Sequence, residues 1–199
     1  MARNLPALIA ILIYPAACHA GFCSAKPAAD FPRHEFRFSA GYSPQSSTLI
    51  GTSKDRRFVV AEFDYSYSCW RTAAGLTPGI MPAAVLLQPA GFTASHAVYG
   101  FAFTPIGFTV DLAQHSTAHP FFETSGGMIA STEPIPVNVP NATSVNFLFD
   151  FGGGLVWRLD QRHSARFGYK FLHISNAGRT VVNPGVDNNV FYAGFSFLK

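Results

Sequence analysis

The chain has few charged residues, few cysteines and, after its N-terminal region, no long unbroken apolar run. Asp, Glu, Lys and Arg make up 13% of the 199 residues, about half of the roughly 25% found in soluble proteins. The net charge of +3 and the lack of a basic cluster argue against nucleic-acid binding. No later segment reaches the ~20 apolar residues of a membrane-spanning helix. The lack of a long apolar segment excludes an α-helical membrane protein, and the small net charge without a basic cluster excludes a nucleic-acid-binding protein.

The first twenty residues have the pattern of a secretory signal peptide. Arg3 supplies the basic start, residues 5–17 are apolar apart from Pro15, and small residues precede Ala20. A lipoprotein signal ending at Cys18 is the alternative, although Pro15 fits it poorly. We expect a signal peptide at 1–20 and a single domain at 21–199. Export makes a disulfide between Cys23 and Cys69 possible, and the sequence leaves that pairing open.

Aromatic residues are plentiful, and they recur with a period of two. The chain contains 20 phenylalanines. Between Val145 and Leu159 the odd-numbered positions are almost all apolar, over a stretch too long for a typical soluble strand of about 5–6 residues. Residues 35–42, 59–68, 166–171 and 190–197 show the same alternation. This pattern is typical of tilted strands that cross a bilayer.

The two faces of these predicted strands differ in kind. One face is apolar and aromatic. The other collects acids and bases in nearly equal numbers: Arg37, Glu62, Asp64, Asp150, Arg158, Arg166 and Lys170. Lipid cannot satisfy a charge or an open sheet edge, so the charged face belongs inside a closed barrel. A soluble lipid-binding barrel would need an apolar interior instead. The sequence therefore predicts an all-β fold, an eight-stranded antiparallel outer-membrane β-barrel.

Long and short links between the strands give this barrel an orientation. Residues 43–56, 131–143 and 176–188 are long and polar and are expected outside the cell, whereas 113–119 and 160–163 are short and periplasmic. We expect the third strand within 73–88 and the fourth within 97–113. In the fourth, the outward-facing positions change parity at residues 105–107, which a β-bulge or a tight turn would explain.

The residues that suggest chemistry lie near the C-terminus. His173 and Ser175 are two apart on a predicted strand, so they share a face, and that face is the apolar one. A histidine within reach can activate a serine as a nucleophile, and Asp187, before the last strand, could orient the imidazole. Asn176 could support an oxyanion through its side-chain amide or a nearby backbone N–H. The alternative is that these are ordinary strand-end residues in a non-catalytic barrel with a structural or adhesive role.

Three C-terminal motifs resemble the PagL family of lipid A 3-O-deacylases, which are outer-membrane acyloxyacyl hydrolases. They are His173-x-Ser-Asn-Ala177, Asn183-Pro-Gly-Val-Asp187 and the final strand at 191–197, and weaker similarity extends upstream to about residue 97. The resemblance implies an eight-stranded barrel with a Ser-His-acid triad on its outer surface. The acid of the family is typically Glu, and the equivalent spacing falls on Asp187; Glu123 is the other acid considered.

The resemblance also implies a substrate and a location. The substrate would be lipid A of lipopolysaccharide, cut at its 3-O-linked acyl chain from a site facing the outer leaflet. No cofactor or metal is needed for such an esterase. Four cations in or beside the predicted extracellular loops could meet lipid A phosphates, or could be ordinary loop charges: Lys54, Arg56, Arg57 and Arg179. A homodimer is possible, and acyl position and chain length are not specified by the sequence.

Overall fold

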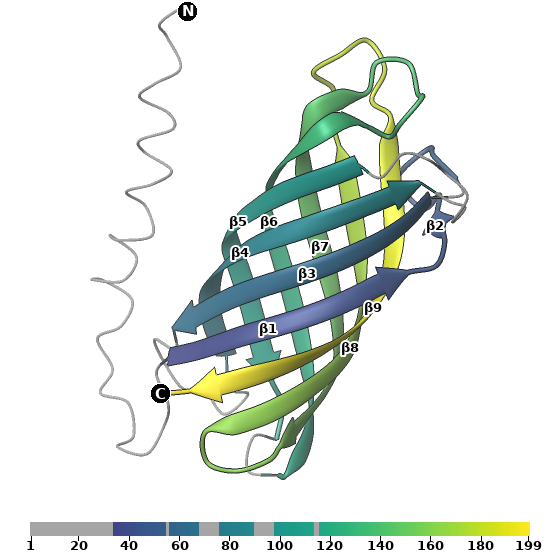
Figure 1. Ribbon diagram of the computed structural model, residues 1–199. Coiled ribbons are helices and arrows are strands. Elements are labelled where there is room, and N and C mark those ends of the chain that lie inside the picture. The colour runs from purple at the N-terminus through teal and green to yellow at the C-terminus, as the bar shows by residue number, and fades with distance from the viewer. Residues whose placement is uncertain (1–33, 55, 68–75, 90–97, 114–115) are drawn as a thin grey trace, which may run out of the picture.

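Antiparallel strands closed on themselves form the whole described structure (Figure 1). The computed structural model describes residues 34–54, 56–67, 76–89, 98–113 and 116–199, and the side chains of 67 and 76–89 are not considered. The predicted signal peptide, Cys23 and Cys69 lie outside the described residues. The strands are β1 His34–Ser43, β2 Ser46–Ser47, β3 Arg56–Tyr67, β4 Leu76–Pro89, β5 Val98–Asp111, β6 Ala118–Ile135, β7 Thr143–Arg158, β8 His163–Ser175 and β9 Gly185–Leu198.

The barrel is closed by pairing between the first and last strands. Each long strand pairs with the next one along the chain, and β9 pairs with β1 over Phe36↔Phe197 to Tyr42↔Phe191. The two residues of β2 pair with Asp187 and Asn188, so they extend the β1–β9 seam past a break at residues 44–45. Eight long strands were expected, and this count is confirmed. No described helix is long and apolar enough to span a membrane.

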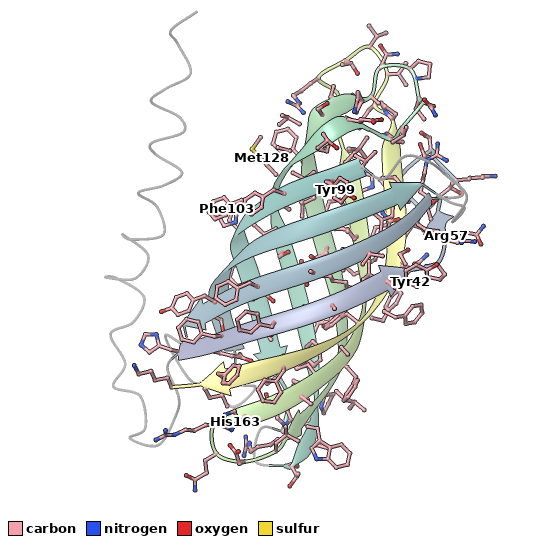
Figure 2. All side chains as sticks on the ribbon, viewed as in Figure 1. Tyr42, Arg57, Tyr99, Phe103, Met128 and His163 are labelled. Carbon is pink, nitrogen blue, oxygen red and sulfur yellow. The ribbon has the colours of Figure 1, made fainter. Side chains whose placement is uncertain are left out.

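Side-chain alternation on each strand separates an aromatic exterior from a charged interior. Phe147, Phe149 and Phe151 of β7 are exposed, whereas Asp150 between them is buried. Figure 2 shows Tyr42 and Phe103 among the outward side chains. This arrangement is the reverse of a soluble barrel and matches one surrounded by lipid.

The buried charges pair across the barrel interior. Arg37 of β1 lies 3.0 Å from Glu123, 3.7 Å from Asp64 and 3.6 Å from Glu35. Arg166 is 3.1 Å from Glu35. Lys170 pairs with Glu62 and lies 3.4 Å from Asp150. The expected balance of acids and bases inside the barrel is therefore realised as specific ion pairs, some of which join strands that are not neighbours, such as Arg37 of β1 with Glu123 of β6 and Lys170 of β8 with Glu62 of β3.

The change of parity in β5 is a bulge. The pairing of β5 with β6 shifts register between Phe103 and Ile106, and both residues are exposed. An extra residue in one strand moves the following side chains to the opposite parity, which keeps apolar residues facing outward on both sides of the shift. The fourth predicted strand therefore continues through residues 105–107 without a turn, and β4 lies at 76–89, close to the range expected for the third.

The short links lie close to their predicted positions, whereas one predicted long link is shorter in the structure. The short links fall at 112–117 and 159–162, and in the second Asp160 accepts hydrogen bonds from the backbone N–H groups of Arg162 and His163, which lower the pKa of its carboxyl. The expected link at 131–143 is shorter, because β6 continues to Ile135 through a register shift opposite β7. The hydroxyl of Ser131 lies within hydrogen-bond distance of the Glu133 and Ser144 carbonyls, at 2.7 and 3.1 Å, and its single O–H stabilises the irregular backbone there.

Replacing Arg37 by Met should destabilise the barrel without touching its outer face. The substitution leaves the buried carboxyls of Glu123, Asp64 and Glu35 without their shared cation. Losing one partner of a buried ion pair lowers the free energy of unfolding by about 3–5 kcal/mol. Urea unfolding of the refolded protein measures this, with the exposed Lys54→Ala as control. Equal unfolding midpoints for both variants would contradict the structural role of the pairs.

Candidate functional site

Two adjacent strands bring His173, Ser175 and Asp187 together at one end of the barrel. In the β8–β9 pairing His173 stands opposite Asp187, and Ser175 stands opposite Gly185. Directly paired residues of antiparallel strands project from the same face. His173 Nδ1 lies 2.6 Å from Asp187 Oδ1, which is a short hydrogen bond. The residues predicted from the sequence as a group are therefore neighbours in space.

The imidazole is held in a fixed place. The Phe149 ring of β7 lies 5.2 Å from it at an interplanar angle of 39°. Gly185 leaves room for the ring, because a Cβ there would fall 2.8 Å from His173 Cε1 and 3.4 Å from Nε2. An ionised carboxylate only accepts hydrogen bonds, so the Nδ1–Asp187 contact assigns the proton to Nδ1. Nε2 is then the basic nitrogen, and it lies over Gly185, the cross-strand partner of Ser175.

All three side chains are buried although they have outward parity. His173 is 6% exposed, Ser175 7% and Asp187 0%, whereas Tyr169 and Phe191, on the same face further along the strands, are 39% and 59% exposed. Something must therefore cover the site from outside the sheet. Part of the cover is Phe149, and the rest is a segment of the first long link.

That segment, residues 48–53, is called the strap here. The backbone N–H groups of Ile50 and Gly51 donate to Asp187 Oδ2 at 2.7 and 2.8 Å. Those of Thr52 and Ser53 donate to the Gly185 carbonyl at 2.9 and 3.0 Å. Sequence reasoning treated 43–56 as an ordinary extracellular loop and missed this contact. The one available signal was the apolar Leu49-Ile50-Gly51 within an otherwise polar loop.

Asn176 is buried next to the site, but its side chain holds a loop. Its amide nitrogen lies within hydrogen-bond distance of the Asn141 carbonyl, the Val182 carbonyl and the Thr180 hydroxyl, at 3.2, 3.2 and 2.6 Å. Its amide oxygen accepts the N–H of Gly178. An amide has only two N–H donors, and both have acceptors here. The predicted oxyanion role therefore suits a backbone N–H of this loop better than the Asn176 side chain.

Glu123, the other acid considered, lies inside the barrel. It pairs with Arg37 and accepts the hydroxyl of Tyr192, so it does not approach His173. Asp187 is the acid that the structure places beside the histidine. Among the described residues, no group of three or more His, Cys, Asp and Glu side chains could hold a metal ion.

Arg56 and Arg179, both considered for phosphate binding, make contacts within the protein. Arg56 donates to the carbonyls of Lys54 and Val137. Arg179 donates to the carbonyls of Asn176 and Val145, and its guanidinium lies 5.2 Å from the centre of the Phe147 ring. Phe147 pairs with Ser175, so Arg179 fixes the loop beside the serine. Phosphate binding by any of the four cations stays a prediction.

Comparisons with known proteins agree with this fold. A sequence profile described as lipid A 3-O-deacylase (PagL) matches residues 60–196, well over half of the chain. The crystal structure of the outer membrane enzyme PagL superposes with a TM-score of 0.57 at 19% identity, covering 80% of this chain and 97% of that one. Neisserial surface protein A superposes with a TM-score of 0.58 at 12% identity, covering 82% and 96%.

A search of curated proteins gave no match. At these identities the two structures support the barrel fold alone, and the family is established by the profile, whose matched range includes His173, Ser175 and Asp187. The chain belongs to the PagL family of lipid A 3-O-deacylases.

Proposed function

We propose that this protein hydrolyses the 3-O-linked acyl ester of lipid A in the outer leaflet, with Ser175 as nucleophile, His173 as base and Asp187 as the orienting acid. The observation that carries the proposal is the His173–Asp187 hydrogen bond on the outward face of the barrel. Ser175 lies on the same strand as His173, two positions further along. A structural barrel has no use for a hydrogen-bonded histidine and aspartate on the side that faces lipid, where polar groups are costly.

The chemistry follows from the proton positions. His173 Nε2 takes the proton of Ser175 Oγ while that oxygen attacks the ester carbonyl. The tetrahedral intermediate then breaks its bond to the sugar oxygen, which receives the proton from Nε2. Water, deprotonated in turn by His173, cleaves the acyl-serine and releases a 3-hydroxy fatty acid. Asp187 keeps Nδ1 protonated and stabilises the imidazolium formed in each half.

Ser175 must turn toward the base before it reacts. Within the described residues no hydrogen bond joins Ser175 Oγ to His173. Catalytic hydrogen bonds are often long or misaligned without substrate and tighten in the complex. A rotation about the Ser175 Cα–Cβ bond brings Oγ toward the cross-strand neighbour Gly185, over which Nε2 lies. A backbone N–H of the 176–184 loop is the expected oxyanion donor.

The position of the site suits a substrate that stays in the membrane. The outward surface below it is aromatic, with Phe149, Phe151, Tyr169 and Phe191 exposed. Acyl chains can lie against these side chains while the sugar headgroup stays at the level of Ser175. Lipid A then reaches the serine by lateral diffusion. Recognition of its phosphates by Lys54, Arg56, Arg57 and Arg179 and formation of a homodimer are further predictions.

The direct test is mass spectrometry of lipid A after incubation with the detergent-refolded protein. We expect loss of one 3-hydroxyacyl mass with the parent and none with Ser175→Ala. Ser164→Ala is the matched control, because Ser164 is a buried serine on the same strand with the opposite parity. Heat-modifiable gel mobility shows that each barrel is folded. Unchanged lipid A with a folded parent would reject the deacylase and favour a structural barrel.

A second test addresses the geometry of the base. Gly185→Ala places a Cβ 2.8 Å from His173 Cε1 and displaces the imidazole, whereas the same change at Gly126 meets only the Leu148 carbonyl at 3.9 Å. A displacement of about 1 Å at a reacting group can reduce rates by about 100-fold. We expect that loss in deacylation for Gly185→Ala and near-parent rates for Gly126→Ala. Equal rates would show that His173 is not held over Gly185 during the reaction.

A further inference from the structure

The two carboxylate oxygens of Asp187 bind different groups, and the strap supplies the partners of one of them. Oδ1 binds the imidazole, and Oδ2 accepts the backbone N–H groups of Ile50 and Gly51. Three hydrogen bonds thus fix the carboxylate in one orientation. Hydrogen bonds to charged groups are each stronger than neutral ones, because the charge assists them.

Without the strap, the acid would be exposed on the side of the barrel that faces lipid. Asp187 is 0% exposed and has outward parity. A carboxylate in an apolar environment is tolerated only when it is paired and hydrogen-bonded. The strap supplies the donors that lipid lacks, so it is the element that allows an ionised acid at this position.

The strap is anchored so closely that side chains would not fit beneath it. A Cβ on Gly51 would fall 2.7 Å from the backbone of Gly185 and 2.9 Å from Asp187 Oδ1. At its base the hydroxyl of Ser46 donates to the Ser53 carbonyl and accepts the N–H of Arg56. Ser46 therefore holds the two ends of this loop together, and the strap between them crosses Asp187.

The outer surface of the strap is apolar. Leu49 is 72% exposed and Ile50 is 55% exposed, in a loop whose other residues are mostly polar. The strap follows β2, which extends the β1–β9 seam, and the lipid-facing Tyr42 and Phe191 pair at the end of that seam. Figure 1 shows β2 at the same end of the barrel as the start of β9. Apolar side chains that continue a lipid-facing surface are expected to insert among lipids.

We propose that the strap is a positioning element for the acid and that it is seated by insertion of Leu49 and Ile50 into the outer leaflet. This inference rests on the proposed function, because it assigns the strap to the same triad. The main-chain N–H groups of Ile50 and Gly51 hold Asp187, and Asp187 holds His173. The lipid that contains the substrate also stabilises the conformation in which the acid is held.

The first test removes the backbone donor and keeps the position. Ile50→Pro lacks the N–H that binds Asp187, and Ile50→Val retains both the N–H and an apolar side chain. Gly51→Ala is an independent variant, because its Cβ would push the strap away from Gly185 and Asp187. Gel mobility again reports folding. We expect kcat on lipid A to fall on the order of 100-fold in Ile50→Pro and Gly51→Ala, with KM changed less than about twofold and Ile50→Val like the parent.

A spectroscopic readout separates this proposal from the proposed function. The proton shared by His173 Nδ1 and Asp187 gives a far-downfield NMR signal that does not depend on turnover. We expect this signal in the parent, in Ser175→Ala and in Ile50→Val, and its loss or shift in Ile50→Pro and Gly51→Ala. If the parent shows the signal but no deacylation, the proposed function fails while the strap is still tested. An unchanged signal in both strap variants would overturn the positioning role.

The second test asks where Leu49 lies. Nitroxide labels are placed singly at Leu49, Lys54 and Phe191 in the mature protein with Cys23 and Cys69 replaced by Ser, in phospholipid vesicles containing lipopolysaccharide. Phe191 is the lipid-facing control and the exposed Lys54 the aqueous one. We expect Leu49 to resemble Phe191, accessible to oxygen and protected from a nickel chelate. A Leu49 label as accessible to nickel as Lys54 would overturn insertion into the leaflet.

Discussion

Closure of the sheet between β1 and β9 is the constraint on which the rest of the structure depends. Lipid offers no hydrogen bonds, so a sheet within it must pair every strand edge. Once the sheet is closed, the alternation of each strand assigns every side chain to lipid or to the interior. Aromatic residues such as Phe149 face outward, and charges such as Arg37 must find partners inside. The ion pairs and the aromatic surface are therefore two consequences of one closed hydrogen-bond pattern.

The group proposed as catalytic is an exception to this division, and the structure compensates for it locally. His173, Ser175 and Asp187 have outward parity but are nearly inaccessible, because Phe149 covers the imidazole and the strap covers the acid. An esterase acting on a membrane lipid needs polar groups on the side where polar groups are least stable. The Phe149 ring beside the imidazole and the two backbone N–H groups on Asp187 hold these polar groups in place on the outward face.

The parts of the structure that depend on period-two patterning were predictable from the sequence. Parity predicted that Asp150 and Lys170 face inward and that His173 and Ser175 face outward. It also located the irregularity at residues 105–107, but left a bulge and a tight turn as alternatives. The strap was not predictable, because its contacts use backbone N–H groups and join residues 136 and 137 positions apart. Every residue type except proline has a backbone N–H, so such a bond leaves no mark on composition or spacing. For the same reason the sequence could suggest Asn176 as an oxyanion donor but could not show that its amide is engaged by Asn141, Thr180 and Val182.

The location of the acid also links assembly of the barrel to assembly of the site. Asp187 pairs with Ser47 of β2, opposite the side on which it pairs with His173 of β8. The strap follows β2 directly, so its N–H groups reach Asp187 only when the N-terminal strand has joined the C-terminal one. In an open sheet His173 and Asp187 would still be neighbours on β8 and β9, but Oδ2 would have no strap donors. The carboxylate would then be free to rotate away from the imidazole. The ordered arrangement of His173 and Asp187 is thus a property of the closed barrel, and in an incompletely assembled chain Asp187 would lack the two N–H donors that hold it beside His173.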